Sequence, residues 1–142
     1  MLDADDRAAI LELESRYAQA VDDGDLDAVV ACFAADAEAL YDDGLEVALR
    51  GEAEIRAFFT MAFEELVGPK HPCTHLLGGV TITDDGDGAR SDARMVAYLT
   101  REPGALIMKG LRYLDRLELR DDTWRITHRH HTCSWEAVTP TR

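Results

Sequence analysis

Three side chains that could transfer protons together are Tyr17 and Asp22, which lie close in sequence, and His75, which lies in a later apolar segment. An imidazole, with an ordinary pKa of about 6.5, can remove a proton at neutral pH. A neighbouring carboxylate can fix the imidazole tautomer and stabilise the imidazolium that forms, and a phenol can hydrogen-bond a ketone or a leaving hydroxyl. These residue types could therefore eliminate water from a carbon skeleton, with one histidine acting as base and then as acid.

The spacing of Tyr17 and Asp22 places a condition on this hypothesis. On an ideal helix, residues five apart lie about 140° from each other. The two side chains share a wall only if the helix frays or turns near Asp22, and the run Asp22-Asp23-Gly24-Asp25 favours such a turn. The alternative is that Tyr17 is an ordinary core residue, Asp22 a solvated helix end and His75 a satisfied buried histidine. These residues alone leave both interpretations open.

Other histidines raise the question of a metal site. His128, His130 and His131 are close in sequence, but the adjacent pair would point to opposite faces of a strand and no acidic ligand is near. His71 and His75 have the spacing of a helical metal pair, yet a proline lies between them in a segment typical of loop and strand. The chain also lacks a glycine-rich phosphate loop. We therefore expect no metal, nucleotide or flavin cofactor.

The elements that must position these side chains begin with helices. Apolar residues at helical spacing, aspartates that can cap and glycines that can interrupt predict three helices and a short hairpin. The expected elements are a helix over 5–21, a short helix with an apolar stripe from Leu26 to Phe33, strands over 37–41 and 45–49, and a helix over 52–66.

Long strands follow these helices. Four segments rich in β-branched and aromatic residues are separated by short turns, which favours antiparallel neighbours. They cover residues 73–83, 89–101, 106–120 and 123–135. Helices followed by hairpin-linked strands indicate a single α+β domain over 1–142, in which the helices cover one face of a curved antiparallel sheet. Strands this long must twist and bend, and bulges would let the sheet curl into a cone with an open mouth.

The composition limits the partners of the chain. A net charge of −13 opposes binding to nucleic acid or an anionic membrane, so we expect a small, mostly apolar ligand. No apolar run approaches the roughly 18 residues of a membrane span, and the N-terminus does not resemble a secretion signal. Cys32, Cys73 and Cys133 have no paired spacing. These features predict a cytoplasmic protein with reduced thiols.

Alternation along the last strand creates a conflict. Trp124 and Ile126 would share one face with His128 and His130, while Arg129 would lie on the other face. Arg129 faces the same cavity as Trp124 only if a bulge intervenes; otherwise His128 or His130 is the pocket residue. The residues expected to line a substrate pocket are Phe33, Tyr41, Phe58, Tyr98, Met108 and Trp135, although each of them alone could equally be a core residue.

The order of several motifs resembles the SnoaL-like branch of the nuclear transport factor 2-like superfamily. The motifs are Arg16-Tyr17-x-x-Ala20-x-Asp22-x-Gly24-Asp25, Phe33-x-x-Asp36-Ala37, Gly51-x-x-x-Ile55, His75, Gly110-x-x-Tyr113-x-Asp115 and Trp124-Arg125-Ile126-x-x-Arg129. Each motif is loose, but their order and spacing cover nearly the whole chain and imply a cone-shaped fold. Within this branch the chain looks most like scytalone dehydratase, bile acid 7α-dehydratase and hexachlorocyclohexane dehydrochlorinase, metal-free lyases with a His–Asp dyad.

This resemblance implies roles for particular residues. His75 stands where the lyases place their base and Asp22 where they place its orienting carboxylate. Tyr17 matches a tyrosine of the bile acid enzyme, and Arg129 matches an arginine of the dehydrochlorinase that assists the leaving group. The resemblance implies a cofactor-free dehydratase of a small hydrophobic or polycyclic hydroxylated compound. It also implies a homo-oligomer, with a trimer preferred over a dimer, because the uncovered face of the sheet needs a partner.

Other functions fit the same fold, because fold does not determine function. The alternatives are an isomerase or polyketide-type cyclase, a non-catalytic small subunit of an aromatic-ring dioxygenase, and a ligand-binding module. Whether the side chains of His75 and Asp22 are in contact bears on all of these functions. If the two side chains point to separate surfaces, the lyase hypothesis loses its mechanism.

Overall fold

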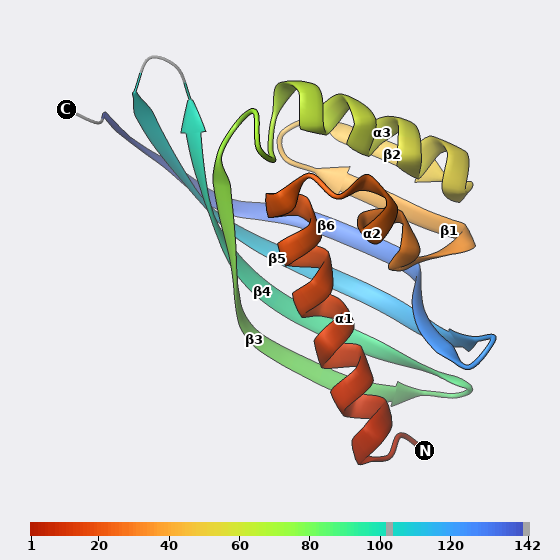
Figure 1. Cartoon of the computed structure of the whole chain (residues 1–142). Coiled ribbons are helices and arrows are strands. Elements are labelled where there is room, and N and C mark those ends of the chain that lie inside the picture. Colours follow the sequence, from red (N-terminus) through yellow and green to blue (C-terminus); the bar gives the residue numbers. More distant parts are fainter. Residues whose placement is uncertain (102–103, 141–142) are drawn as a thin grey trace.

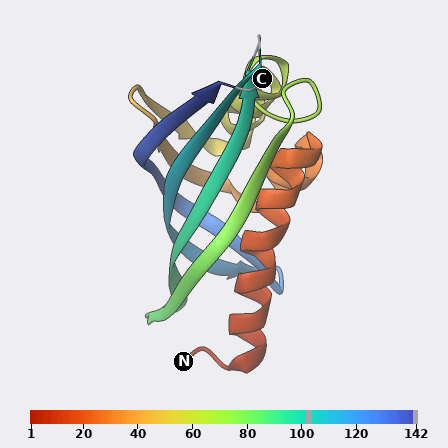
Figure 2. The ribbon, with the colours of Figure 1, turned by 90° about the vertical axis from the view of Figure 1, so that its left-hand side faces the viewer.

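Three helices cover one face of a six-stranded sheet in this protein (Figure 1). The computed structural model describes residues 1–101 and 104–140. The elements are α1 (Ala4–Asp23), α2 (Leu26–Ala31), β1 (Phe33–Asp42), β2 (Glu46–Arg50), α3 (Gly51–Glu65), β3 (Cys73–Asp85), β4 (Gly88–Arg101), β5 (Ala105–Arg120) and β6 (Thr123–Pro140). Figure 2 shows that the sheet is curved and does not close on itself. The expected α+β architecture is confirmed.

The longest helix, α1, is fixed at both ends by local sequence. Asp3 accepts a hydrogen bond from the backbone of Asp6, whose side chain accepts one from Asp3 in return, so the first turn has a complete capping box. At the other end Gly24 adopts a left-handed conformation with φ of 68°. A Cβ atom there would lie 2.5 Å from Cδ of Pro69, so glycine is required both for its backbone angle and for the close approach of the following loop.

The strands are ordered β2-β1-β6-β5-β4-β3 across the sheet. Neighbouring strands are antiparallel except β1 and β6, which pair in parallel. The expectation that Phe33 belongs to the stripe of the second helix is wrong, because α2 ends at Ala31 and Phe33 begins β1 in register with Ile126 of β6. The four long strands are antiparallel neighbours, as expected, and the sheet is mostly antiparallel.

A bulge in β6 resolves the conflict along this strand. Arg116 of β5 pairs with His128, and Leu117 pairs with Ile126, so Thr127 is an extra residue without an opposite partner. Beyond the bulge the alternation is reversed, and Arg129 and His131 face the helices together with Ile126. His128 and His130 are exposed on the other face, where they line a depression of the outer surface, so neither of them lines the cavity on the inner face.

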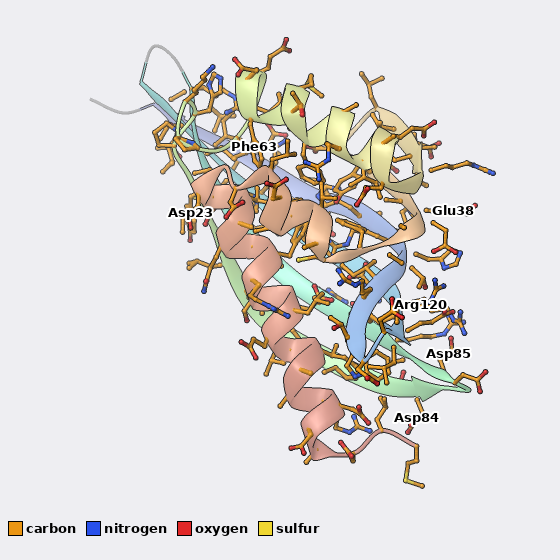
Figure 3. The ribbon with its side chains drawn as sticks, turned by 45° about the vertical axis from the view of Figure 1, so that its right-hand side comes forward. Asp23, Glu38, Phe63, Asp84, Asp85 and Arg120 are labelled. Carbon is orange, nitrogen blue, oxygen red and sulfur yellow. The ribbon has the colours of Figure 1, made fainter. Side chains whose placement is uncertain are left out.

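The core lies between the helices and the inner face of the sheet. Its most completely buried apolar side chains come from both layers and include Ile10, Leu13, Ile55, Leu117 and Ile126. Of the helices described here, none is long and apolar enough to cross a membrane. Figure 3 labels Asp23 and Phe63 near the ends of α1 and α3, at the opposite end of the molecule from Asp84 and Asp85 in the β3–β4 turn. The candidate site lies at the end marked by Asp23.

Candidate functional site

Asp22 and His75 meet where the last turn of α1 lies against β3. Nδ1 of His75 is 2.7 Å from Oδ1 of Asp22. The backbone N–H of His75 also donates to both carboxylate oxygens, at 3.1 Å and 2.9 Å. The carboxylate is therefore held by the backbone of the residue whose ring it orients. The side chain of His75 is 7% exposed and that of Asp22 is 21% exposed, so solvent screens this contact only in part.

The charge state of Asp22 follows from these contacts. Partial burial raises the pKa of its carboxyl group, but hydrogen bonds from the ring and backbone of His75 outweigh that effect and hold the pKa below its ordinary value. Because Asp22 is ionised at neutral pH, it accepts the proton of Nδ1. This fixes the tautomer in which Nε2 of a neutral His75 is unprotonated and able to accept a proton.

A third donor group lies beside the dyad. The thiol of Cys73 donates to Oδ1 of Asp22 at 3.3 Å, and burial raises the pKa of this thiol to about 11. One ligand atom from each of Asp22, Cys73 and His75 lies within 4.8 Å of the others, so this group could hold a metal ion. Sequence reasoning missed it, because it considered cysteines only for paired spacing. Holding an ion would require the loss of the protons from the thiol and Nδ1.

A cavity of about 390 Å³ lies next to the dyad and is lined by His75. Tyr17 and Tyr41 also line it, and their hydroxyl oxygens are 2.8 Å apart. Most other lining side chains are apolar, including Val21, Phe58, Phe59, Ala62, Leu99 and Leu111. Asp22 is not among the lining residues and lies behind the ring of His75. The structure thus brings Tyr17 and His75 to one cavity, although the tyrosine bonds Tyr41 and not the dyad.

Of the Asp, Lys and Arg side chains that line this cavity, two are paired with each other. Lys109 forms an ion pair with Asp43 and also lies 3.8 Å from Glu136. Arg101 forms no ion pair among the described residues and donates to the backbone carbonyl of Leu66 at 2.9 Å. Because the rest of the lining is mostly apolar, the cavity suits a mostly apolar ligand.

Arg129 belongs to a buried polar cluster beneath the tyrosines. Its guanidinium donates two hydrogen bonds to Asp115, at 2.9 Å and 2.6 Å, and one to Glu14 at 3.2 Å. It also lies over the ring of Tyr17, 4.1 Å from the centroid. Burial would lower the pKa of Arg129, but Asp115 outweighs that effect and raises it. Arg129 is completely buried and does not line the 390 Å³ cavity. Its position beneath Tyr17 suits an indirect effect on the phenol.

Glu14, on the buried side of α1, completes this cluster. Its carboxyl group accepts a hydrogen bond from Ser91 at 2.7 Å and lies close to Asp115. Burial, and then the charge of Asp115, raise the pKa of Glu14 to about 8. A single guanidinium between two buried carboxyl groups can neutralise only one of them, so Glu14 holds its proton at neutral pH.

Of the six residues predicted to line a substrate pocket, two line this cavity. These are Tyr41 and Phe58. Phe33 is buried behind Tyr17, with ring centroids 6.1 Å apart. Tyr98 and Met108 pair across β4 and β5, on the face opposite to their neighbours Leu99 and Lys109, which line the cavity.

Trp135 is also on the outer face. It is 49% exposed and covers Gly110 of β5, where any larger residue would collide with the indole. The predictions for Phe33, Tyr98, Met108 and Trp135 are therefore wrong for this cavity. Sequence alternation gives the side chains of a strand two faces but does not say which face is enclosed.

The sequence interpretation also missed His131, which lines the cavity from β6. Its ring lies 5.1 Å from that of Tyr41 and 4.9 Å from that of Tyr113, centroid to centroid. Burial and the nearby charge of Arg129 lower the pKa of His131 to about 4, so the ring is neutral at pH 7. The only signal in the sequence was its position two residues after Arg129, on the same face of the strand.

A larger depression, of about 860 Å³, lies on the outer face of the sheet. Charged residues there include Glu38, Arg50, Arg90, Asp92 and Arg116. Neither residue of the dyad contributes to it. Several of these side chains form ion pairs along the strands, such as Arg116 with Asp85 at 2.9 Å. Size alone therefore does not identify the site where the proton-transfer groups converge.

Comparison with known proteins agrees with this architecture. Residues 3–130 match the SnoaL-like domain family. A protein from Novosphingobium aromaticivorans, provisionally described as an aromatic ring hydroxylase, is 27% identical in sequence and superposes with a TM-score of 0.82. That alignment covers 99% of this chain and 96% of the other. A comparison with curated protein sequences gave no match.

Two lyases have a similar fold. A protein provisionally described as scytalone dehydratase, also from N. aromaticivorans, is 16% identical with a TM-score of 0.78, and the alignment covers 96% of this chain and 89% of the other. Hexachlorocyclohexane dehydrochlorinase (LinA) type 2 is 17% identical with a TM-score of 0.78, covering 94% and 88%. At these identities the similarity concerns the fold alone.

Proposed function

Because the chain belongs to the SnoaL-like domain family, we propose that it is a cofactor-free lyase that dehydrates a small hydrophobic or polycyclic hydroxylated compound. The observation that carries this proposal is the 2.7 Å contact between His75 Nδ1 and Asp22 in the wall of a mostly apolar cavity. Proteins described as a scytalone dehydratase and a dehydrochlorinase share this fold, so the fold is compatible with elimination chemistry.

The reaction follows from the tautomer that Asp22 holds. Nε2 of His75 takes a proton from a carbon next to a carbonyl group, and the electron pair of the C–H bond forms a C=C bond. The bond from the adjacent carbon to the hydroxyl group breaks and the oxygen takes its electron pair. The imidazolium of His75, stabilised by Asp22, returns the proton to this oxygen, so the products are an unsaturated ketone and water.

Tyr17 and Tyr41 serve as a polar contact in the same cavity. Two hydroxyl groups that share one hydrogen bond retain one free donor between them, and this donor can bind a carbonyl or a departing oxygen. Burial raises the pKa of both tyrosines, so both remain neutral hydrogen-bond donors across the neutral pH range. The Arg129 guanidinium over the Tyr17 ring stabilises negative charge that develops on this phenol.

Steady-state kinetics on a bicyclic β-hydroxyketone test the proposal. Dehydration of 3-hydroxy-1-tetralone, followed by tautomerisation, yields fluorescent 1-naphthol. We expect His75→Ala and Asp22→Ala each to remove most turnover, by roughly 10²–10⁴-fold, and the double variant to lose little more, because base and carboxylate act as one unit. Tyr17→Phe should cost less, since it removes one hydrogen bond and leaves the base intact.

The matched control is His128→Ala, which removes an exposed imidazole from the outer face of the sheet. This variant should retain the wild-type rate. Near-normal turnover by His75→Ala would refute the mechanism even though the fold stands. If the ketone is isomerised or cyclised without loss of water, the same dyad serves an isomerase or cyclase, and product analysis by mass spectrometry separates these outcomes.

A second candidate is a non-catalytic role in aromatic ring hydroxylation. It is suggested by the 27% identity to the protein described as an aromatic ring hydroxylase, together with the similar fold of a protein provisionally described as the beta subunit of an aromatic-ring-hydroxylating dioxygenase. A purified chain in such a role would bind bicyclic aromatic compounds or a partner subunit without turning over the hydroxyketone. Equal product formation with and without the chain, across a panel of β-hydroxyketones, would favour this candidate over the lyase.

A further inference from the structure

His131 is a buried polar group that the proposed reaction does not use. Its ring is packed between Tyr41 and Tyr113, which fix its plane, and the residue is 7% exposed. Tyr41 and Tyr113 are also its register partners on the neighbouring strands β1 and β5. The ring therefore has little freedom to turn toward another partner.

The hydrogen-bonding capacity of this ring is unmet by the protein. Nδ1 is fully buried and has no hydrogen-bond partner among residues 1–101 and 104–140. No hydrogen bond from Nε2 is found within that part of the chain either, although the ring lines the cavity. Because Nδ1 is enclosed, Nε2 is the nitrogen that a ligand in the cavity can reach. An enclosed N–H group without an acceptor is costly, so the proton of the neutral ring lies on Nε2, where a ligand in the cavity can accept it.

The position of His131 complements that of His75. His75 lies on β3 and His131 on β6, with β4 and β5 between them in the sheet. Since both rings line one cavity, the curvature of the sheet brings two imidazoles to different sides of the same ligand. The ring of His75 is committed to Asp22 through Nδ1, whereas no carboxylate among residues 1–101 and 104–140 hydrogen-bonds the ring of His131, and Asp43 acts on it only through its charge.

We propose that Nε2 of His131 donates a hydrogen bond to a ketone oxygen of the ligand, which makes the cavity selective for alicyclic or aromatic ketones of about two rings over hydrocarbons of the same shape. A neutral imidazole suits this task, because it binds an uncharged oxygen without the cost of burying a second cation beside Arg129. A cavity of about 390 Å³ has room for such a bicyclic compound.

This inference rests on the proposed function only for the reaction that the bound ketone then undergoes. In that reaction the ketone oxygen gains negative charge as the neighbouring C–H proton leaves, so a fixed N–H group at this oxygen stabilises the transition state. Binding of a ketone that cannot lose water requires no chemistry. The two proposals can therefore be tested separately.

The experiment compares 1-tetralone, which has the carbonyl but no hydroxyl group, with tetralin, which has the same ring system without oxygen. Dissociation constants are measured by NMR titration of the full-length chain. We expect wild type to bind 1-tetralone about 5- to 30-fold more tightly than tetralin, the range for satisfying one buried donor. His131→Phe, which keeps an aromatic ring between the two tyrosines, should lose this preference and still bind tetralin.

Two further variants show which group holds the oxygen. His128→Ala, on the outer face of the sheet, is the matched control and should keep the preference for 1-tetralone, whereas Tyr17→Phe tests whether the tyrosine pair holds the oxygen instead. A long-range ¹H–¹⁵N correlation spectrum of the wild type tests the hydrogen bond at His131 without any substitution. The Nε2 signal of His131 should shift with 1-tetralone and stay unchanged with tetralin.

An unmoved Nε2 signal, or a His131→Phe variant that keeps the preference, would overturn the inference. Loss of the preference in Tyr17→Phe alone would overturn it as well, by assigning the oxygen to the tyrosine pair. If hydroxyketone turnover is absent while the preference depends on His131, the lyase proposal fails and this inference stands. If turnover depends on His75 but the preference for 1-tetralone does not depend on His131, the lyase proposal stands and this inference fails.

Discussion

Replacing Glu14 by glutamine tests the charge state of the buried cluster without any knowledge of a substrate. Glu14, Ser91, Asp115 and Arg129 form a buried set of polar side chains in which two carboxyl groups share one guanidinium. If Glu14 holds a proton at neutral pH, a glutamine of the same shape reproduces its contacts. The variant should then fold, and near pH 6.5 its free energy of unfolding should lie within about 1 kcal/mol of wild type.

The expected effect lies in the pH dependence of stability. The pKa of Glu14 is about 8 in the folded protein against an ordinary value of 4.5, so between these values the native state binds a proton that the unfolded state has lost. Its contribution to stability is therefore full below about pH 4.5 and is lost as the pH rises to about 8. The slope for one group is at most about 1.4 kcal/mol per pH unit. From pH 6.5 to 8 the wild type should lose roughly 1–2 kcal/mol through this group.

His131 acts in the opposite direction but in a lower window. Its folded pKa of about 4 lies below the ordinary 6.5, so its contribution is present above pH 6.5 and is lost as the pH falls to about 4. Measurements above pH 6.5 therefore isolate Glu14. We expect the difference in stability between Glu14→Gln and wild type to change by roughly 1–2 kcal/mol in favour of the variant across this range.

Urea unfolding at half-unit intervals from pH 6.5 to 8, followed by circular dichroism, measures this difference. Glu12→Gln is the matched control, because Glu12 is an exposed glutamate on the same helix. It should give a curve parallel to wild type, which separates the effect of Glu14 from the general repulsion of an acidic protein. Parallel curves for Glu14→Gln and wild type would show that Glu14 is ionised in the folded state, and the reasoning on the buried cluster would be refuted.

Further predictions concern the dyad, its helix end and the assembly. Gly24→Ala should destabilise the fold by roughly 1–3 kcal/mol, because it places a side chain at positive φ against Pro69, and a smaller loss in urea unfolding would contradict this account. Turnover of 3-hydroxy-1-tetralone should survive chelation by EDTA, whereas activity that EDTA removes and one metal restores would make the metal essential. Added Zn²⁺ should inhibit by displacing protons at Asp22, Cys73 and His75, and Cys73→Ser should weaken this inhibition; equal inhibition of both proteins would exclude the thiol. Light scattering should report a homo-oligomer, with a trimer preferred over a dimer, and a purely monomeric protein would contradict this prediction.

The arrangement of helices and strands could be predicted from the sequence, because each element has a local signature. The apolar spacing of α1 and the capping residue Asp3 are properties of consecutive residues. The turns between the long strands are equally local. The parallel pairing of β1 with β6 has no such signature, since it joins segments about ninety residues apart whose register depends on the whole sheet. Phe33 fits both a helix stripe and a strand, and only this pairing decides between them.

Local sequence patterns identify some polar residues of the site but not the contacts between them. Asp22 and His75 could be identified as candidates by residue type, but their contact depends on the left-handed turn at Gly24 and on where β3 crosses the end of α1. Whether they catalyse a reaction is a question for kinetics. The buried cluster was harder to foresee, since Glu14 looks like any helical glutamate until Asp115 and Arg129 meet it in register.

The bulge at Thr127 connects these observations. With strict alternation Arg129 and His131 would lie outside, and the inner face at these positions would carry His128 and His130 instead. One extra residue in β6 exchanges the two sets, so that Arg129 enters the cluster beneath Tyr17 and His131 enters the cavity. The sequence is compatible with either arrangement, because polar residues occupy both faces of this segment. The burial of Asp115 favours the bulged arrangement, because a carboxylate on the inner face requires a cation there, and the bulged strand provides Arg129, which also hydrogen-bonds Glu14.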